Sequence, residues 1–179
     1  MTDSLIPVTP GLDEPLEILA ACHGRMLAQL ETLDRLVRWL PDHGADEDAQ
    51  KAAANVMRYF DSAAVNHHRD EEEDVFPLLL ERCSAAAGMR IRRLVNWVTD
   101  DHRALEAAWA ALRVALEAIA QGRSSSLCAD EVANFSSRYL SHIDREDNEL
   151  FPFAANVLSA DDLRVLSQRM RARRTSPTK

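Results

Sequence analysis

The chain has 179 residues, of which 46% are hydrophobic, and a formal net charge of −8 at pH 7. This length suits one domain with a single core, and only five glycines and seven prolines favour helices over a turn-rich β fold. The negative charge argues against nucleic acid or an anionic membrane as the main partner. Because there is no signal segment and no apolar run near the length of a membrane span, we expect a cytoplasmic protein.

The apolar periodicity predicts an all-α protein, an up-down-up-down four-helix bundle with a short C-terminal fifth helix. Residues 1–14 hold two prolines and a glycine and predict an extended N-terminal lead-in. Residues 15–158 are predicted to form the bundle, and residues 159–179 the short C-terminal helix and a tail. The first helix is expected to open at Pro15 and to end in the turn Pro41-Asp42-His43-Gly44.

The next three helices are predicted from their apolar faces, and the fifth from its opening residues. The faces run from Val56 to Leu78, from Ile91 to Ile119 and from Val132 to Val157. Ser159 and Asp162 resemble a capping box that opens the fifth helix, and Arg171–Arg174 are expected to end it.

One phrase occurs twice in the chain. A histidine, a glutamate four residues later and a Phe-Pro pair recur 75 residues apart, as His67, Glu71 and Phe76-Pro77 and as His142, Glu146 and Phe151-Pro152. On a helix, residues four apart lie on the same face, about 6 Å apart along the axis. Each pair can therefore direct a nitrogen and an oxygen at one metal ion, and two copies predict a two-metal site.

Each long helix also places one histidine in its apolar stripe, at His23, His67, His102 and His142. A lone histidine of this kind is usually a core residue with a polar partner. Here, however, two glutamates accompany the four imidazoles, and an unpaired buried carboxylate costs several kcal/mol. The combination favours a pair of metal ions in the middle of the bundle.

These residues resemble the hemerythrin-like (HHE cation-binding) family over about residues 15–158. The family signature is one histidine on the first and third helices, and His-x-x-x-Glu followed by Leu-Phe-Pro on the second and fourth. The first and third helices supply Cys22-His23-Gly24-Arg25 and Asp101-His102-Arg103-Ala104-Leu105, and only Val75 departs from the Leu-Phe-Pro wording. The resemblance implies two iron ions, with carboxylate bridges and an oxo or hydroxo bridge, held by His23, His67, Glu71, His102, His142 and Glu146.

Three assignments near this ligand set have alternatives. His68 and Glu72 form a second His-x-x-x-Glu pair, but Asp61 lies seven residues before His68, so the His67 face is expected to be the drier one. Asp147 could replace Glu146, since oxygen-carrying hemerythrins use His-x-x-x-x-Asp on their last helix. Their second histidine on the third helix is missing here, because Glu106 follows His102 by four residues and Val98 precedes it by four.

The donor types narrow the metal and the chemistry. Imidazole and carboxylate suit Fe, with Mn or Zn fitting less well, whereas the widely spaced cysteines Cys22, Cys83 and Cys128 contain no Cys-x-x-Cys pair for a thiolate zinc site. Four histidines, two bridging carboxylates and an oxo bridge would supply roughly ten of the twelve positions around two six-coordinate irons, which leaves about two positions open. The resemblance therefore implies a protein that binds or reacts with O₂, NO or peroxide, in sensing, storage or stress protection.

Two other functions compete with this prediction. The same ligands could serve a redox enzyme, such as a di-iron oxidase, peroxidase or iron–sulfur repair protein, or the chain could be a metal-free helical interaction module. A sensor would have to act through a protein partner or a homodimer, because no second domain is visible.

Overall fold

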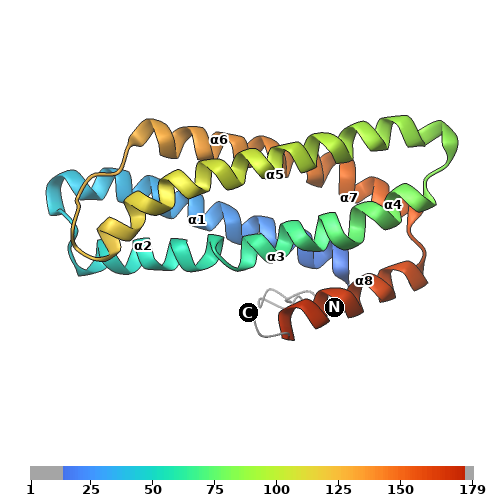
Figure 1. The fold of residues 1–179 in the computed structure, drawn as a ribbon, viewed down its shortest axis with the longest axis horizontal. Helices are drawn as coiled ribbons and strands as arrows, with labels where there is room; N and C mark the ends of the chain where they lie inside the picture. Colours follow the sequence, from blue (N-terminus) through green and yellow to red (C-terminus); the bar gives the residue numbers. More distant parts are fainter. Residues whose placement is uncertain (1–13, 176–179) are drawn as a thin grey trace, which may run out of the picture.

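The computed structural model describes residues 14–175 and consists of helices without a strand in that range. Four long helical stretches run along one another, and a last helix packs along one half of the bundle, at the lower right of Figure 1. The elements are α1 (Pro15–His43), α2 (Glu47–Phe60), α3 (Ala63–Asp70), η1 (Glu71–Val75), α4 (Phe76–Arg82), α5 (Ala85–Ala120), α6 (Ala129–Arg145), η2 (Glu146–Leu150), α7 (Phe151–Val157) and α8 (Ala160–Thr175). The predicted fold class is confirmed, while the lead-in and the last four residues of the tail lie outside the described part.

Local chemistry sets the ends of these helices. Pro15 occupies the first turn of α1, where its missing N–H costs nothing, and Gly44 ends that helix with a φ of 67°. Asp46 caps α2 by accepting a hydrogen bond from the Ala49 N–H at 2.8 Å. The capping box at α8 is confirmed, since Ser159 N–H donates to Asp162 Oδ2 at 3.0 Å and Asp162 N–H donates to Ser159 Oγ at 3.2 Å.

The second long stretch is not the continuous α-helix that its apolar face predicts. It breaks at Asp61–Ser62, between α2 and α3, and the Asp61 carboxylate accepts hydrogen bonds from Trp109 Nε1 at 2.9 Å and Arg113 Nε at 2.9 Å. These two donors on α5 offer the Asp61 side chain partners at the point where the chain leaves helical geometry. The break lies about one turn before the repeated phrase.

Each copy of the repeated phrase contains a π-helical turn. In η1 the Phe76 N–H bonds to the Glu71 carbonyl, and in η2 the Phe151 N–H bonds to the Glu146 carbonyl, five residues back in both cases. Such wide turns are uncommon and often lie at functional sites. Both glutamates are therefore the first residue of a π turn.

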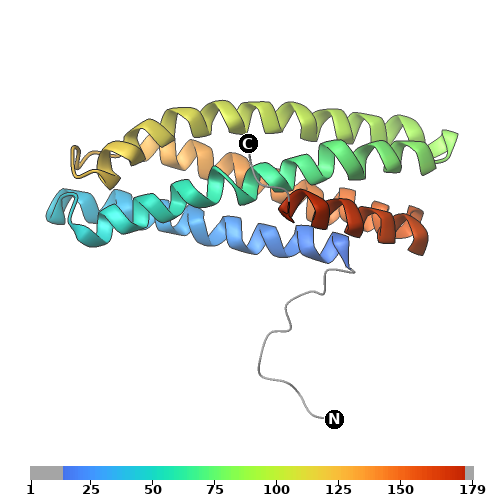
Figure 2. The same cartoon turned by 60° about the horizontal axis from the view of Figure 1, so that its bottom comes forward.

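Apolar side chains form two clusters, and each of the four long stretches passes from one to the other at a predicted ligand, which is Glu146 in the last stretch. On α1, Leu19 belongs to one cluster and Met26 to the other, with His23 between them. On α5, Val98 and Leu105 flank the predicted ligand in the same way. Figure 2 shows the long helices side by side, with α8 packed against the half that holds the second cluster. None of the described helices is both long and apolar enough to cross a membrane.

Candidate metal centre

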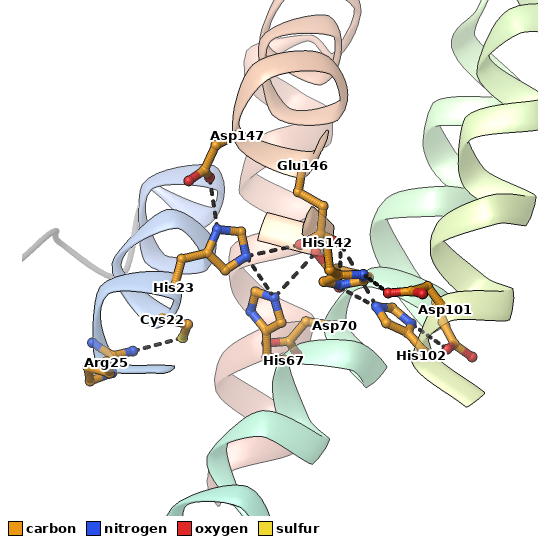
Figure 3. Close-up of polar contacts among 12 residues, drawn as sticks. Cys22, His23, Arg25, His67, Asp70, Asp101, His102, His142, Glu146 and Asp147 are labelled. Carbon is orange, nitrogen blue, oxygen red and sulfur yellow. Dashed lines mark hydrogen bonds and ion pairs between the residues drawn. The ribbon is translucent and has the colours of Figure 1, made fainter. Parts of the chain in front are cut away.

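The structure brings the six predicted ligand residues into one buried cluster at the middle of the bundle (Figure 3). Each of the four long stretches contributes, and every one of these side chains is at most 2% exposed. The six ligand candidates are His23 on α1, His67 on α3, Glu71 in η1, His102 on α5, His142 on α6 and Glu146 in η2.

Their donor atoms form two overlapping groups of four. In each group, one atom from every residue lies within 4.8 Å of the others. The first group contains His23, His67, Glu71 and Glu146, and the second contains Glu71, His102, His142 and Glu146. Both glutamates belong to both groups, which is the arrangement that two carboxylate-bridged cations require.

The two oxygens of Glu71 face opposite members of the cluster. Oε1 lies 3.5 Å from His67 Nε2, and Oε2 lies 3.3 Å from His102 Nε2. A carboxylate held in this way can contact one cation with each oxygen.

Glu146 divides its oxygens in the same manner. Oε2 lies 3.0 Å from His23 Nε2, and Oε1 lies 3.1 Å from His142 Nε2. In addition, the Nε2 atoms of His23 and His67 are 3.2 Å apart, close enough to contact the same cation. The repeated sequence phrase therefore becomes a repeated geometry, with one bridging carboxylate from each copy.

Most of these inward atoms lack a hydrogen-bond partner among the described residues. Both oxygens of Glu71 and of Glu146, and Nε2 of His102 and His142, are buried without one. Short nitrogen–oxygen approaches exist, but their angles do not satisfy a hydrogen bond. Since leaving buried carboxylates unsatisfied is costly, the donor set fits a pair of cations and fits a metal-free core poorly.

Carboxylates hold three of the histidines from the outer side. The Nδ1 atoms of His23, His102 and His142 pair with Asp147 at 2.8 Å, Glu72 at 2.7 Å and Asp101 at 3.1 Å. A carboxylate on Nδ1 fixes the ring and directs Nε2 at a metal. By contrast, His67 Nδ1 is buried without a partner among the described residues.

The outer contacts bear on the alternatives that the sequence leaves open. Asp147 contacts His23 from outside and belongs to neither inner group, and Glu72 faces Arg103 and the outer nitrogen of His102. The inner positions are taken by Glu146 and Glu71. Glu106 is exposed and pairs with Arg103 at 2.8 Å, away from the inner groups.

The metal-free cluster holds its charge unevenly. Burial, followed by the repulsion of Glu146, raises the pKa of Glu71 well above its usual range. Although burial alone would raise the pKa of Glu146, the adjacent imidazole of His142 holds it well below that range. Burial opposes the charged form of His142, but contacts with Asp101 and Glu146 raise its pKa to about 9. The metal-free cluster therefore favours a protonated Glu71 beside an ion pair of His142 and Glu146.

His68 is buried, being only 6% exposed, although its sequence position also allowed an exposed side chain. Its ring stacks on His102 with a centroid distance of 3.9 Å, and its Nε2 has no hydrogen-bond partner among the described residues. Stepping back by four residues instead of seven meets Ala64 and Phe60, both buried. That four-residue series is the sequence signal that would have placed His68 inside.

Cys22 and His43 belong to neither of the two groups of four donor residues. Cys22 is 3% exposed, accepts a hydrogen bond from Arg25 at 2.8 Å, and has a pKa raised by burial. His43 is exposed and stacks on Trp39. No metal-binding group among residues 14–175 contains a cysteine.

Comparison with known proteins agrees with this geometry. The chain is 30% identical over 162 residues to an uncharacterized protein from Haemophilus influenzae, and the match covers 90% of this chain and 91% of the relative. The family model of the hemerythrin HHE cation binding domain matches residues 14–154, a range that holds all six ligand candidates. The chain therefore belongs to the hemerythrin HHE cation-binding domain family.

Proposed function

We propose that this protein holds two iron ions between its four long helices and binds or reacts with O₂, NO or peroxide. The observation that carries the proposal is the pair of four-residue donor groups that share Glu71 and Glu146. Four imidazoles and two carboxylates, without a thiolate, suit Fe, Mn or Zn. An iron pair supplies reversible one-electron chemistry and open positions for a small molecule.

The surrounding residues prepare this centre for a cation pair. Asp101, Glu72 and Asp147 orient three imidazoles, so their Nε2 atoms face inward before a metal arrives. The two apolar clusters exclude water from both ends of the centre. Within it, four histidines and two bridging glutamates provide eight of the roughly twelve bonds that two six-coordinate ions take, so small molecules can complete the set.

Metal analysis of the protein purified and reconstituted without oxygen tests the proposal. We expect about two irons per chain and near-ultraviolet absorption that appears on oxidation and changes when NO is added to the reduced protein. One iron or fewer per chain, or zinc in place of iron after reconstitution with both metals, would contradict it. Steady-state consumption of peroxide or NO would instead assign a redox enzyme that uses the same ligands.

Matched variants locate the centre. Glu71→Ala and Glu146→Ala should each abolish binding of both ions, because each carboxylate belongs to both donor groups. Glu73→Ala is the control, since this neighbouring side chain is half exposed and pairs with Arg69 and Arg173. Equal iron content in all three variants would show that the metal lies elsewhere.

A further inference from the structure

A narrow cavity of about 40 Å³ lies where α3 faces α5, beside the break that separates α2 from α3. Its outer residues include Val65 and Glu106, both exposed, and its buried residues include His68 and Tyr139, which are 6% and 3% exposed. Since about 10–15 Å³ suffices for one water molecule, this space admits a diatomic molecule.

His68 separates the inner part of the cavity from the metal centre by the thickness of one ring. Its imidazole stacks on His102, with an interplanar angle of 15°. A metal lies close to the plane of an imidazole that binds it, whereas the planes of these two stacked rings, inclined by only 15°, meet far outside bonding distance of either ring. His68 and His102 therefore do not hold the same cation in this arrangement, even though a nitrogen of each lies close to a nitrogen of His142.

The unpartnered ring nitrogen of His68 could bind a ligand. Nε2 is buried and has no hydrogen-bond partner among residues 14–175. Leaving a buried polar atom unsatisfied costs about 1–3 kcal/mol. A small molecule with a polar atom that enters the cavity can satisfy it.

The two larger grooves along α5 do not lead to this point. These grooves, of about 630 and 570 Å³, follow α5 on its side toward α6 and η2. They are lined by Asp101 and by other residues, but by none of the six ligand candidates and not by His68.

We propose that the cavity between α3 and α5 is the route by which a small uncharged molecule enters the metal centre, and that His68 forms a hydrogen bond with that molecule. The inference rests on the proposed function and adds to it the entrance and the residue that selects the ligand. Apolar walls formed by Phe60 and Leu105, with Glu106 at the outer end, disfavour anions. The ligand class is thus a neutral diatomic molecule or peroxide.

Narrowing the outer end of the cavity tests the route. Val65→Trp should lower the association rate constant of NO with the reduced, iron-loaded protein by about tenfold or more, a range typical of changes along one binding path. Val114→Trp is the control, because Val114 is an exposed valine of α5 that lines none of these three cavities. Equal rates in the two variants, with iron content unchanged, would overturn the route and leave the proposed function standing.

Xenon provides a readout that is independent of reactivity. Crystals of the protein as purified, pressurised with xenon, should show the gas beside His68, and Val65→Trp should abolish that peak while Val114→Trp keeps it. Xenon elsewhere in the bundle and absent from this cavity would overturn the proposal.

Changing His68 tests the hydrogen bond. His68→Leu should keep both irons and raise the dissociation rate constant of the bound molecule about two- to tenfold, the range for losing one hydrogen bond. His68→Gln should raise the dissociation rate constant less than His68→Leu does, since the glutamine amide can still donate a hydrogen bond. Loss of iron in both variants would make His68 a ligand, and unchanged dissociation in both would remove its contact with the molecule; either result overturns the assigned role.

Discussion

At the scale of single residues, carboxylates contact the outer nitrogens of three imidazoles in the candidate centre. Asp101 accepts from His142 Nδ1 at 3.1 Å and also pairs with Arg138 at 2.6 Å, so its position is fixed from two sides. Glu72 is held in the same way, between His102 and Arg103. In both cases a ligand candidate contacts a carboxylate, and that carboxylate contacts an exposed arginine.

Asp101→Asn should lower iron affinity by about 10–100-fold while the helical content stays unchanged. The amide can still contact His142, but it no longer favours the tautomer that directs Nε2 inward. Competition with a chelator of known affinity measures the change. The neighbouring exposed Asp100→Asn is the matched control, and equal affinities in the two variants would show that Asp101 does not orient the ligand.

The protons of the metal-free cluster predict how metal binding depends on pH. His142, with a pKa of about 9, carries a proton at pH 7, and the raised pKa of Glu71 favours its protonated form. Each group must be deprotonated to bind a cation, so we expect loading to release protons at pH 7, with His142 contributing about one per chain. Affinity for Fe²⁺ should rise with pH and level off above about 9.

Calorimetric titration of anaerobic Fe²⁺ in two buffers with different ionisation enthalpies measures the released protons. An affinity that stays constant between pH 6 and 9, with the same apparent enthalpy in both buffers, would contradict the uneven charge of the cluster.

All six ligand candidates could be named from the sequence, because the repeated phrase contains four of them and His23 and His102 lie in the apolar stripes of the other two long helices. Their outer partners could not. Asp101 lies directly before one ligand and contacts another on a different helix, and such pairings depend on how two helices are rotated against each other. Apolar periodicity shows which face of a helix turns toward the core, but not its rotation finely enough to say which side chains of two helices meet.

At the scale of helices, α8 is tied to the metal-binding stretch by arginines. Arg173 pairs with Asp70, with Glu73 at 2.8 Å and with Asp74 at 2.8 Å, and Arg174 pairs with Asp70 at 2.6 Å. Asp70 is completely buried and Asp74 nearly so. The last helix therefore partly covers the acidic residues 70–74.

Arg173→Ala should lower the free energy of unfolding by about 3 kcal/mol, because it leaves buried carboxylates short of a partner. Urea unfolding of the iron-loaded protein measures this. Arg164→Ala is the control, since Arg164 and Asp161 form an exposed pair on the same helix, and its effect should stay within about 0.5 kcal/mol. Similar losses in both variants would mean that the Arg173 contacts add nothing beyond surface charge.

The helices themselves were predictable, but their irregularities were not. The break at Asp61–Ser62 depends on Trp109 and Arg113 from α5, which stabilise the Asp61 side chain. The π turns left a trace in the sequence. His67, Glu71, Val75 and Leu79 are spaced by four and are all at most 1% exposed, whereas a regular α-helix turns by about 40° beyond a full circle at every such step.

At the scale of the whole molecule, the polar centre lies between two apolar clusters. Every long stretch crosses from one cluster to the other at a ligand candidate, as Leu19, His23 and Met26 do on α1. A cation pair bonded to all four stretches would therefore hold both halves of the core together.

Removing the metals with a chelator should lower the Tm by roughly 8–16 °C, which corresponds to ligands present at about a thousand times their dissociation constant in a chain of this size. Thermal scans of iron-loaded and chelated protein measure the difference. Glu146→Gln, which should bind no metal, is the control and should show the same Tm with and without chelator. An unchanged Tm in the native protein would mean that the centre does not stabilise the bundle.

The division of the chain into lead-in, bundle and C-terminal segment stays a prediction. The existence and order of the helices followed from apolar periodicity, whereas the docking of α8 did not. Its arginines could have remained in solvent, and only the buried Asp70 and Asp74 on the facing helix show why they do not.

The π turns also constrain the length of the chain. A π turn equals an α-helix with one residue inserted, so deleting one residue from Glu71–Val75 would restore regular winding. The segment that follows would then rotate by about 100° relative to His67, carrying Leu79 out of the core. The same holds for Glu146–Leu150 and Ala154. The helical segments before and after each π turn are therefore rotated relative to each other about the helix axis. Glu71 and Glu146 lie where this change of rotation begins.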